Sequence, residues 1–196
     1  QVFYDKETSY TNAGEYTVKA TVTLANYNPV ELTATLTINK ATYDMSAVVF
    51  ADKTVTYNGE SHSIEATNLP NGVTAEYTGD NQINAGEYEI TATFKGDSQN
   101  YELIASQTVT LTIEQRELTL AFNGETTLKY NGKAQKTVTV QATNLVNGDS
   151  VELTVSYNGE MIEAGEYIAT ATLTAHQNYK LTANNTVKVT ITRATH

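Results

Sequence analysis

The amino-acid sequence predicts an all-β chain made of repeated antiparallel sandwiches. Three observations indicate this fold: the chain has 34 Thr and 13 Tyr among 196 residues, it contains segments of two-residue hydrophobic alternation, and a set of motifs recurs at offsets of 72 to 79 residues. Thr and Tyr favour strands because a branched Cβ and a broad ring pack well on a pleated surface. Apolar residues are not gathered at helical spacing, so we expect very little helix.

The most regular motif is Ala-Gly-Glu-Tyr, which begins at Ala13, Ala85 and Ala164. Each copy is followed by an Asn-Tyr pair and then by a closing run that is typical of a strand. The pairs are Asn26-Tyr27, Asn100-Tyr101 and Asn178-Tyr179. Ordered landmarks at a nearly constant offset indicate internal repetition of one structural unit.

Two further motifs precede only the second and third copies. Tyr-Asn-Gly occurs at 57–59 and 130–132, and Ala-Thr-Asn-Leu occurs at 66–69 and 142–145. We therefore predict complete modules at 41–115 and 116–196, and the second half of a module at 1–40. These three segments are called the first, second and third repeats below, in chain order.

The residues after each Ala-Gly-Glu-Tyr alternate with a period of two. In the second repeat Tyr88, Ile90, Ala92 and Phe94 share one face, while polar residues take the other. A strand with one buried and one solvated face is typical of antiparallel sheets packed face to face. Asn-Gly pairs mark the expected turns, because both residues tolerate positive φ. They lie at 58–59, 71–72, 131–132, 147–148 and 158–159.

Ala-Gly-x-Tyr before a strand resembles the tyrosine corner of immunoglobulin-type sandwiches, in which the tyrosine hydroxyl bonds the backbone upstream. The resemblance implies structural corner tyrosines and, before each, a glycine that gives the turn its backbone freedom. They are Gly14 and Tyr16, Gly86 and Tyr88, and Gly165 and Tyr167. The cysteine that this family places two residues later is replaced by Val18, Ile90 and Ala169. We prefer the structural role to a sugar-binding platform, because one tyrosine per module in the same register is what a fold determinant requires.

The tyrosines of the Asn-Tyr pairs leave two interpretations open. Tyr27, Tyr101 and Tyr179 either cap the hairpin that follows or stack on a surface ligand. We keep them as candidate ligand residues.

The whole pattern resembles the MBG-type repeats of bacterial cell-surface and adhesin proteins. It comprises the Tyr-Asn-Gly start, the AGEYxxTATF-like strand, the Asn-Tyr pair and the TVTLTI-like close, and it spans both complete modules and the partial one. The resemblance implies tandem immunoglobulin-like sandwiches arranged end to end, in a secreted or wall-attached protein. It supplies no catalytic residues.

Residues that could carry other chemistry are few and scattered. His62, His176 and His196 have no ligand spacing, whereas a zinc site needs several converging ligands. Asp80, Asn81 and Asp97 could offer oxygen ligands to calcium at a module end. No lysine holds the same place in both full modules, as a lysine–asparagine crosslink would require: Lys53 has no counterpart in register, and Lys129 lies just before the next Tyr-Asn-Gly. We expect no catalytic, cofactor or metal residues.

The charge limits the partners. A net charge of −10 argues against nucleic acid and anionic membranes, which would repel the chain. Residues 41–115 carry 11 acids and 2 bases, either as a solvated surface or as a face for cations or a basic partner. No apolar run approaches a membrane span, and no signal segment or sorting tail is recognisable, so we expect a piece of a longer extracellular protein.

Two functions of different classes follow. The first is a non-catalytic stalk, spacer or adhesive unit of a surface protein, with neighbouring modules and a host or glycan ligand as partners. The alternative is a carbohydrate-binding accessory module of a larger secreted enzyme or glycan-capture system. Residues 1–40 form three strands with one apolar face, which we expect to pack on the next module or to exchange with a second copy.

Overall fold

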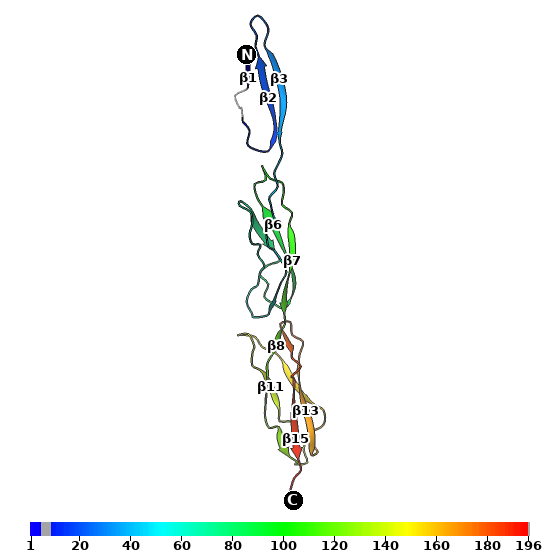
Figure 1. Cartoon of the computed structure of the whole chain (residues 1–196). Helices are drawn as coiled ribbons and strands as arrows, with labels where there is room; N and C mark the ends of the chain where they lie inside the picture. Colours follow the sequence, from blue (N-terminus) through cyan, green and yellow to red (C-terminus); the bar gives the residue numbers. More distant parts are fainter. Residues whose placement is uncertain (5–8, 196) are drawn as a thin grey trace. The chain divides into compact units, whose positions relative to one another are not determined.

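The computed structural model describes residues 1–4 and 9–195. Within these residues the chain forms fifteen strands and no helix (Figure 1). The chain divides into two compact units, one of residues 1–51, 64–80 and 89–109, the other of residues 52–63, 81–88 and 110–196. The predicted class, all-β repeats of immunoglobulin-like sandwiches, is confirmed. The boundaries of the predicted modules stay a prediction.

The first sheet has the order β1-β2-β3 and consists of β1 (Val2–Tyr4), β2 (Gly14–Val22) and β3 (Val30–Ile38). The hairpin β2–β3 pairs from Gly14 opposite Ile38 to Val22 opposite Val30. β2 begins at the glycine of the first Ala-Gly-Glu-Tyr, as the motif predicts. This sheet belongs wholly to the first unit.

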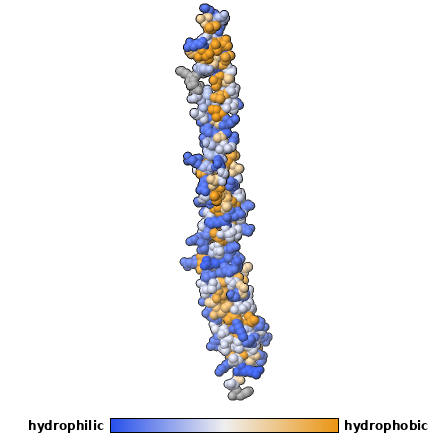
Figure 2. Space-filling view, viewed as in Figure 1, coloured by the Kyte–Doolittle hydropathy of each residue, from blue (hydrophilic) through white to orange (hydrophobic). Residues whose placement is uncertain are grey.

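The apolar face of the first sheet is left uncovered by the described part of the chain. Leu36 on β3 is 41% exposed, whereas Leu111, at the matching position of the second repeat, is 0% exposed. Figure 2 shows apolar side chains gathered over this part of the chain. The exposed large apolar residues here are Val2, Phe3, Tyr4, Leu24, Tyr27, Val30, Leu32 and Leu36. Two-residue alternation thus identified the apolar face, although nothing among the described residues buries it.

The second repeat forms a sheet with the order β4-β7-β6-β5. Its strands are β4 (Lys53–Thr56), β5 (Thr74–Thr78), β6 (Gly86–Lys95) and β7 (Gln107–Glu114). β5 pairs antiparallel with β6, while β4 pairs parallel with β7. The parallel pair departs from the antiparallel sheets that we predicted. It is possible because a long connection, rather than a hairpin, separates the opening strand from the closing one.

A core cluster of the first unit forms beneath β5 and β6. Val73, Ala92 and Phe94 are buried, and Phe50 and Tyr77 pack against them. The Tyr77 hydroxyl accepts a hydrogen bond from the backbone N–H of Ala66 at 2.7 Å, so this ring contributes apolar area without leaving its polar atom unpaired.

The third repeat lies wholly in the second unit. Its sheets have the orders β10-β15-β13-β12, β11-β9 and β14-β8. The strands are β8 (Arg116–Leu118), β9 (Leu120–Asn123), β10 (Thr127–Lys129), β11 (Thr139–Ala142), β12 (Leu153–Tyr157), β13 (Gly165–Leu173), β14 (Tyr179–Leu181) and β15 (Thr186–Thr192). As in the second repeat, the strand just before Tyr-Asn-Gly pairs parallel with the closing strand, here β10 with β15.

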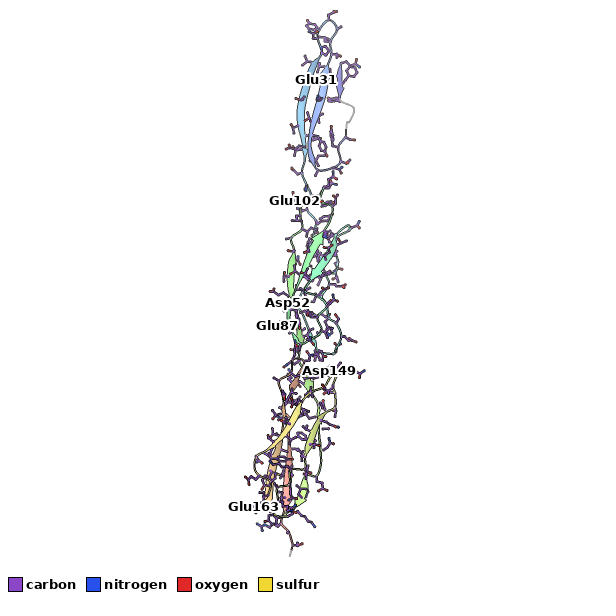
Figure 3. All side chains as sticks on the ribbon, turned by 180° about the vertical axis from the view of Figure 1, so that it is seen from behind. Glu31, Asp52, Glu87, Glu102, Asp149 and Glu163 are labelled. Atoms are coloured by element: carbon purple, nitrogen blue, oxygen red, sulfur yellow. The ribbon has the colours of Figure 1, made fainter. Side chains whose placement is uncertain are left out.

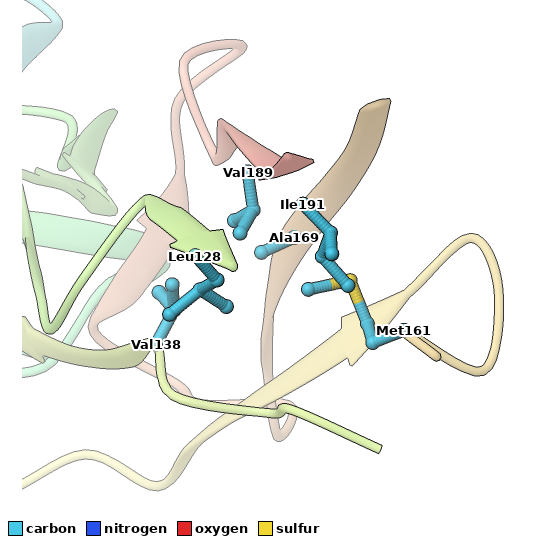
Figure 4. Close-up of a cluster of buried hydrophobic side chains, with 6 residues drawn as sticks. All are labelled: Leu128, Val138, Met161, Ala169, Val189 and Ile191. Atoms are coloured by element: carbon cyan, nitrogen blue, oxygen red, sulfur yellow. The ribbon is translucent and has the colours of Figure 1, made fainter. Parts of the chain in front are cut away.

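The core of the third repeat brings residues from β10, β13 and β15 together (Figure 4). Ala169, Val189 and Ile191 are the positions that the alternation assigned to the apolar face, and all three are buried. Met161 is fully buried with φ of 60°, outside any strand. Its unbranched side chain suits an irregular gap at this end of the core.

Leu111 and Leu36 provide a matched test of what burial contributes. Leu111→Ala should lower the free energy of unfolding by about 2–5 kcal/mol, because it leaves a cavity in a packed core. Leu36→Ala should change it by under about 1 kcal/mol, because that side chain already meets solvent. Urea unfolding followed by circular dichroism measures both values, and equal losses would contradict the structural difference.

Candidate functional site

The three tyrosines of the Ala-Gly-Glu-Tyr motifs make the same hydrogen bond. Each hydroxyl donates to the backbone carbonyl four residues earlier. Tyr16 donates to Asn12 at 2.8 Å, Tyr88 to Asn84 at 2.8 Å and Tyr167 to Glu163 at 2.9 Å. The bond closes a bend just before β2, β6 and β13. The structural role that the sequence assigned to these residues stays a prediction, but their hydroxyls are engaged with the backbone.

The backbone freedom that we expected at the three motif glycines is used at one of them. Gly14 has φ of 155°, but Gly86 and Gly165 are not at positive φ, so backbone freedom does not explain them. A Cβ on Gly86 would lie 3.0 Å from the Tyr88 hydroxyl oxygen. In the second repeat the side chain of Tyr88 thus folds back over Gly86, and the missing Cβ leaves room for it. At Gly165 a Cβ would lie 3.9 Å from the Tyr167 ring, an ordinary contact, so the same reason does not apply there.

Two of the Asn-Tyr pairs bind the bend of the preceding repeat. In the first compact unit, Asn100 Oδ1 accepts the N–H of Ala13 at 2.8 Å, and Asn100 Nδ2 donates to Asn12 Oδ1 at 3.3 Å. We call this arrangement of Asn12, Ala13 and Asn100 the first joint. The orientation of the amide is fixed, because a backbone N–H can only donate.

The second joint, in the second compact unit, repeats this geometry. Asn178 Oδ1 accepts the N–H of Ala85 at 2.8 Å, and Asn178 Nδ2 donates to Asn84 Oδ1 at 3.0 Å. Asn178 is the buried polar residue of the described chain. Because a buried amide left unpaired costs about 1–3 kcal/mol, these bonds fix how the two segments meet.

The same asparagines also bind the segment that connects the repeats. Their backbone carbonyls accept the N–H of Ala41 at 2.8 Å and of Arg116 at 2.9 Å. The residue just before each of these donates a side-chain bond to the carbonyl two positions before the asparagine. Lys40 reaches Ser98 at 2.7 Å, and Gln115 reaches His176 at 2.8 Å. Each asparagine therefore links the bend and the connecting segment of one neighbour.

The second joint contains an additional polar cluster. Asp149 Oδ2 accepts hydrogen bonds from the hydroxyls of Tyr57 at 2.8 Å and Tyr179 at 2.7 Å, and the Tyr179 oxygen accepts the N–H of Val146 at 2.8 Å. The two rings meet edge to face with centroids 5.6 Å apart. Burial, and then the hydrogen bond to Asp149, raise the pKa of Tyr179 to about 12 and raise the pKa of Tyr57 as well. Both hydroxyls therefore stay protonated donors at neutral pH.

Gly59 lets the backbone of the second repeat approach this cluster. It has φ of 80°, and a Cβ built on it would lie 2.5 Å from Val146 Cγ1. The Tyr-Asn-Gly motif thus contributes both a donor, Tyr57, and a surface without a side chain, Gly59. A substitution at Gly59 would push the third repeat away.

The three candidate ligand tyrosines have different surroundings. Tyr27 is 73% exposed, while Tyr179 is 1% exposed and offers no ring face to a ligand. Tyr101 is half-buried and stacks on Tyr43 with centroids 4.0 Å apart. The sequence did not single out Asp149, which follows an Asn-Gly pair in the connection between Ala-Thr-Asn-Leu and the next strand. This connection is longer in the third repeat than in the second repeat, where Val73 follows the pair. Its position one residue after an Asn-Gly pair was the only signal.

The acids do not assemble a site of their own. The acidic side chains labelled in Figure 3 come from different elements, and no three acids, histidines or cysteines within residues 1–4 and 9–195 are grouped so as to hold a metal. Asp97 accepts bonds from the side chain of Asn100 at 2.8 Å and from the N–H of Gln99 at 2.9 Å. The hydrogen bond from Asn100, and then that from Gln99, lower the pKa of Asp97. The Asp97 carboxylate therefore contributes to the first joint by binding the side chain of Asn100. His196 lies outside the described residues.

Comparison with known proteins identifies the family. A family model described as the MBG domain matches residues 1–42, 46–117 and 118–195. The chain belongs to the MBG domain family. The three matches follow the repetition of the motifs, so both joints connect successive MBG repeats.

The likeness to solved structures is weak. The crystal structure of Drosophila N-cadherin EC1-4 matches at 11% identity with a TM-score of 0.26, over 95% of this chain and 59% of that chain. This MBG chain thus spans less than two thirds of that structure's length. No curated protein sequence gives a significant match. The described residues include no apolar helix of membrane-spanning length.

The raised pKa of Tyr179 predicts how the second joint responds to alkali. The folded pKa of about 12 exceeds the ordinary value of 10, so the stabilisation is complete below pH 10 and is lost as pH rises toward 12. Absorbance at 295 nm should show that Tyr179→Phe removes a tyrosine titrating well above pH 10. Tyr27→Phe, at an exposed site, is the control. If Tyr179→Phe removed a tyrosine with an ordinary pKa, the cluster would not form in solution.

Proposed function

We propose that the chain is a non-catalytic run of MBG repeats from an extracellular bacterial surface protein, in which it acts as a spacer or adhesive unit. The observation that carries the proposal is the repeated joint. At both connections the asparagine amide accepts the backbone N–H of the motif alanine and donates to the side-chain oxygen of the residue before that alanine. A contact that recurs with the same geometry at both connections indicates that its residues hold successive repeats together. Membership of the MBG family supports a surface protein.

The polar chemistry of the joints supports a mechanical role over a catalytic one. The perturbed tyrosines donate hydrogen bonds to Asp149 from buried positions, where a substrate has no access. A spacer needs successive repeats held at a defined orientation. A buried amide with several fixed partners supplies such a constraint, because each alternative orientation leaves polar groups unpaired.

Small-angle X-ray scattering tests the spacer function. We expect an extended particle for the natural chain, and greater flexibility for Asn178→Ala, since it breaks the bridge of the second joint. Asn184→Ala, at an exposed asparagine, is the matched control and should scatter as the natural chain does. A compact globule would contradict the proposal. Binding of the natural chain to a glycan array, lost in Tyr27→Ala, would instead favour a carbohydrate-binding module, because Tyr27 has the exposed ring.

We also propose that the uncovered face of the first sheet associates with the same face of a second copy. Contiguous exposed apolar side chains on a sheet are typical of an interaction surface. Sedimentation should show association that rises with concentration and weakens in Leu32→Ser/Leu36→Ser. Thr33→Ser/Thr35→Ser, on the opposite face of β3, is the control. A strict monomer at all concentrations would rule out this association.

A further inference from the structure

The second joint shows which groups of one repeat contact the repeat that follows it. Tyr57 is 4% exposed and donates to Asp149, and the N–H of Ala85 donates to Asn178. Gly59 faces Val146 so closely that no Cβ would fit. The Tyr-Asn-Gly and Ala-Gly-Glu-Tyr motifs of one repeat together form this contact surface.

The third repeat presents the same surface, and nothing among the described residues lies against it. We call Tyr130, Gly132 and residues 163–165 the distal face. Tyr130 is 39% exposed, and Ala164 is exposed where Ala85 is buried. Within residues 1–4 and 9–195 no group accepts a hydrogen bond from the N–H of Ala164.

The local geometry of the distal face already matches the occupied one. A Cβ on Gly132 would lie 3.9 Å from the Tyr130 hydroxyl, the same distance that separates Gly59 from the Tyr57 hydroxyl. Both glycines have positive φ, of 71° and 80°. The difference is that the position filled by Val146 at Gly59 is open at Gly132. The third repeat is thus formed for a contact that its described surroundings do not supply.

The segment after β15 resembles a connecting segment. Arg193-Ala194-Thr195 follows the closing strand as Lys40-Ala41-Thr42 follows β3. At the first joint, Lys40 donates to the carbonyl of Ser98, and the N–H of Ala41 donates to the carbonyl of Asn100. Arg193 carries equivalent donors, and Ala194 supplies the same backbone N–H.

We propose that the distal face binds a further MBG repeat, entered through Arg193, that carries an Asn-Tyr pair and an acid at the position of Asp149. This inference rests on the proposed function and names the partner of the same kind of joint. The acid is needed to accept a hydrogen bond from the Tyr130 hydroxyl, and an apolar residue equivalent to Val146 fits over Gly132. Glu163 replaces Asn84 and keeps a side-chain oxygen that accepts the asparagine N–H.

The test extends the full chain by appending a second copy of residues 116–196 after Arg193. This copy carries the required acid and Asn-Tyr pair. Amide hydrogen exchange should show the N–H of Ala164 slowed at least about tenfold relative to the natural chain, toward the rate of Ala85, because hydrogen bonding and burial protect amides. Asn178→Ala in the appended copy alone should return Ala164 to its natural rate.

Ala85 is the internal reference in both chains. An unchanged exchange rate at Ala164, whether or not the appended copy folds, overturns the inference, and so does equal protection with the Asn178→Ala copy. If Ala85 is protected while Ala164 is not, the distal face fails but the spacer function stands. Rapid exchange at Ala85 in the natural chain would instead contradict the joints on which the proposed function rests.

Discussion

The structure depends most on one side-chain amide placed between two backbone segments. Asn100 and Asn178 each accept from the bend of one repeat and use their own carbonyl to hold the connecting segment. An amide suits this position because it is both donor and acceptor and carries no charge to desolvate. Aspartate would offer no donor at neutral pH, and leucine would leave the alanine N–H unpaired. The joint therefore depends on the chemistry of the amide as well as on its size.

The second joint adds a charged acceptor without a cationic partner. Asp149 is stabilised by two tyrosine hydroxyls, which remain protonated because burial and the nearby carboxylate oppose their ionisation. Phenols provide strong donors together with broad apolar rings, so the cluster excludes water and satisfies the carboxylate at once. Around the first joint the described residues form no such cluster, and Tyr43 stacks on Tyr101 instead. The two joints of this chain thus share one amide geometry in different surroundings.

Much of this fold could be predicted from the sequence, because two-residue alternation directly reports the buried face of a strand. Ile90, Ala169 and Ile191 lie in the cores to which the pattern assigned them. The parallel pairing of β4 with β7 could not be predicted, since alternation does not record strand direction. The joints were missed for a related reason. The partners Ala85 and Asn178 are 93 residues apart, and a hydrogen bond from a backbone N–H leaves no mark on the identity of alanine.

The parallel pairs have a consequence for a chain under tension. Lys53 lies opposite Leu111 and Thr56 opposite Glu114, so force that enters at the start of β4 and leaves at the end of β7 pulls the two strands lengthwise past each other. All hydrogen bonds of the pair then share the load and must break together, unlike those of a hairpin, which open one at a time. β10 and β15 repeat this arrangement. Force applied lengthwise to either strand pair therefore acts in the direction in which its ladder of hydrogen bonds resists most.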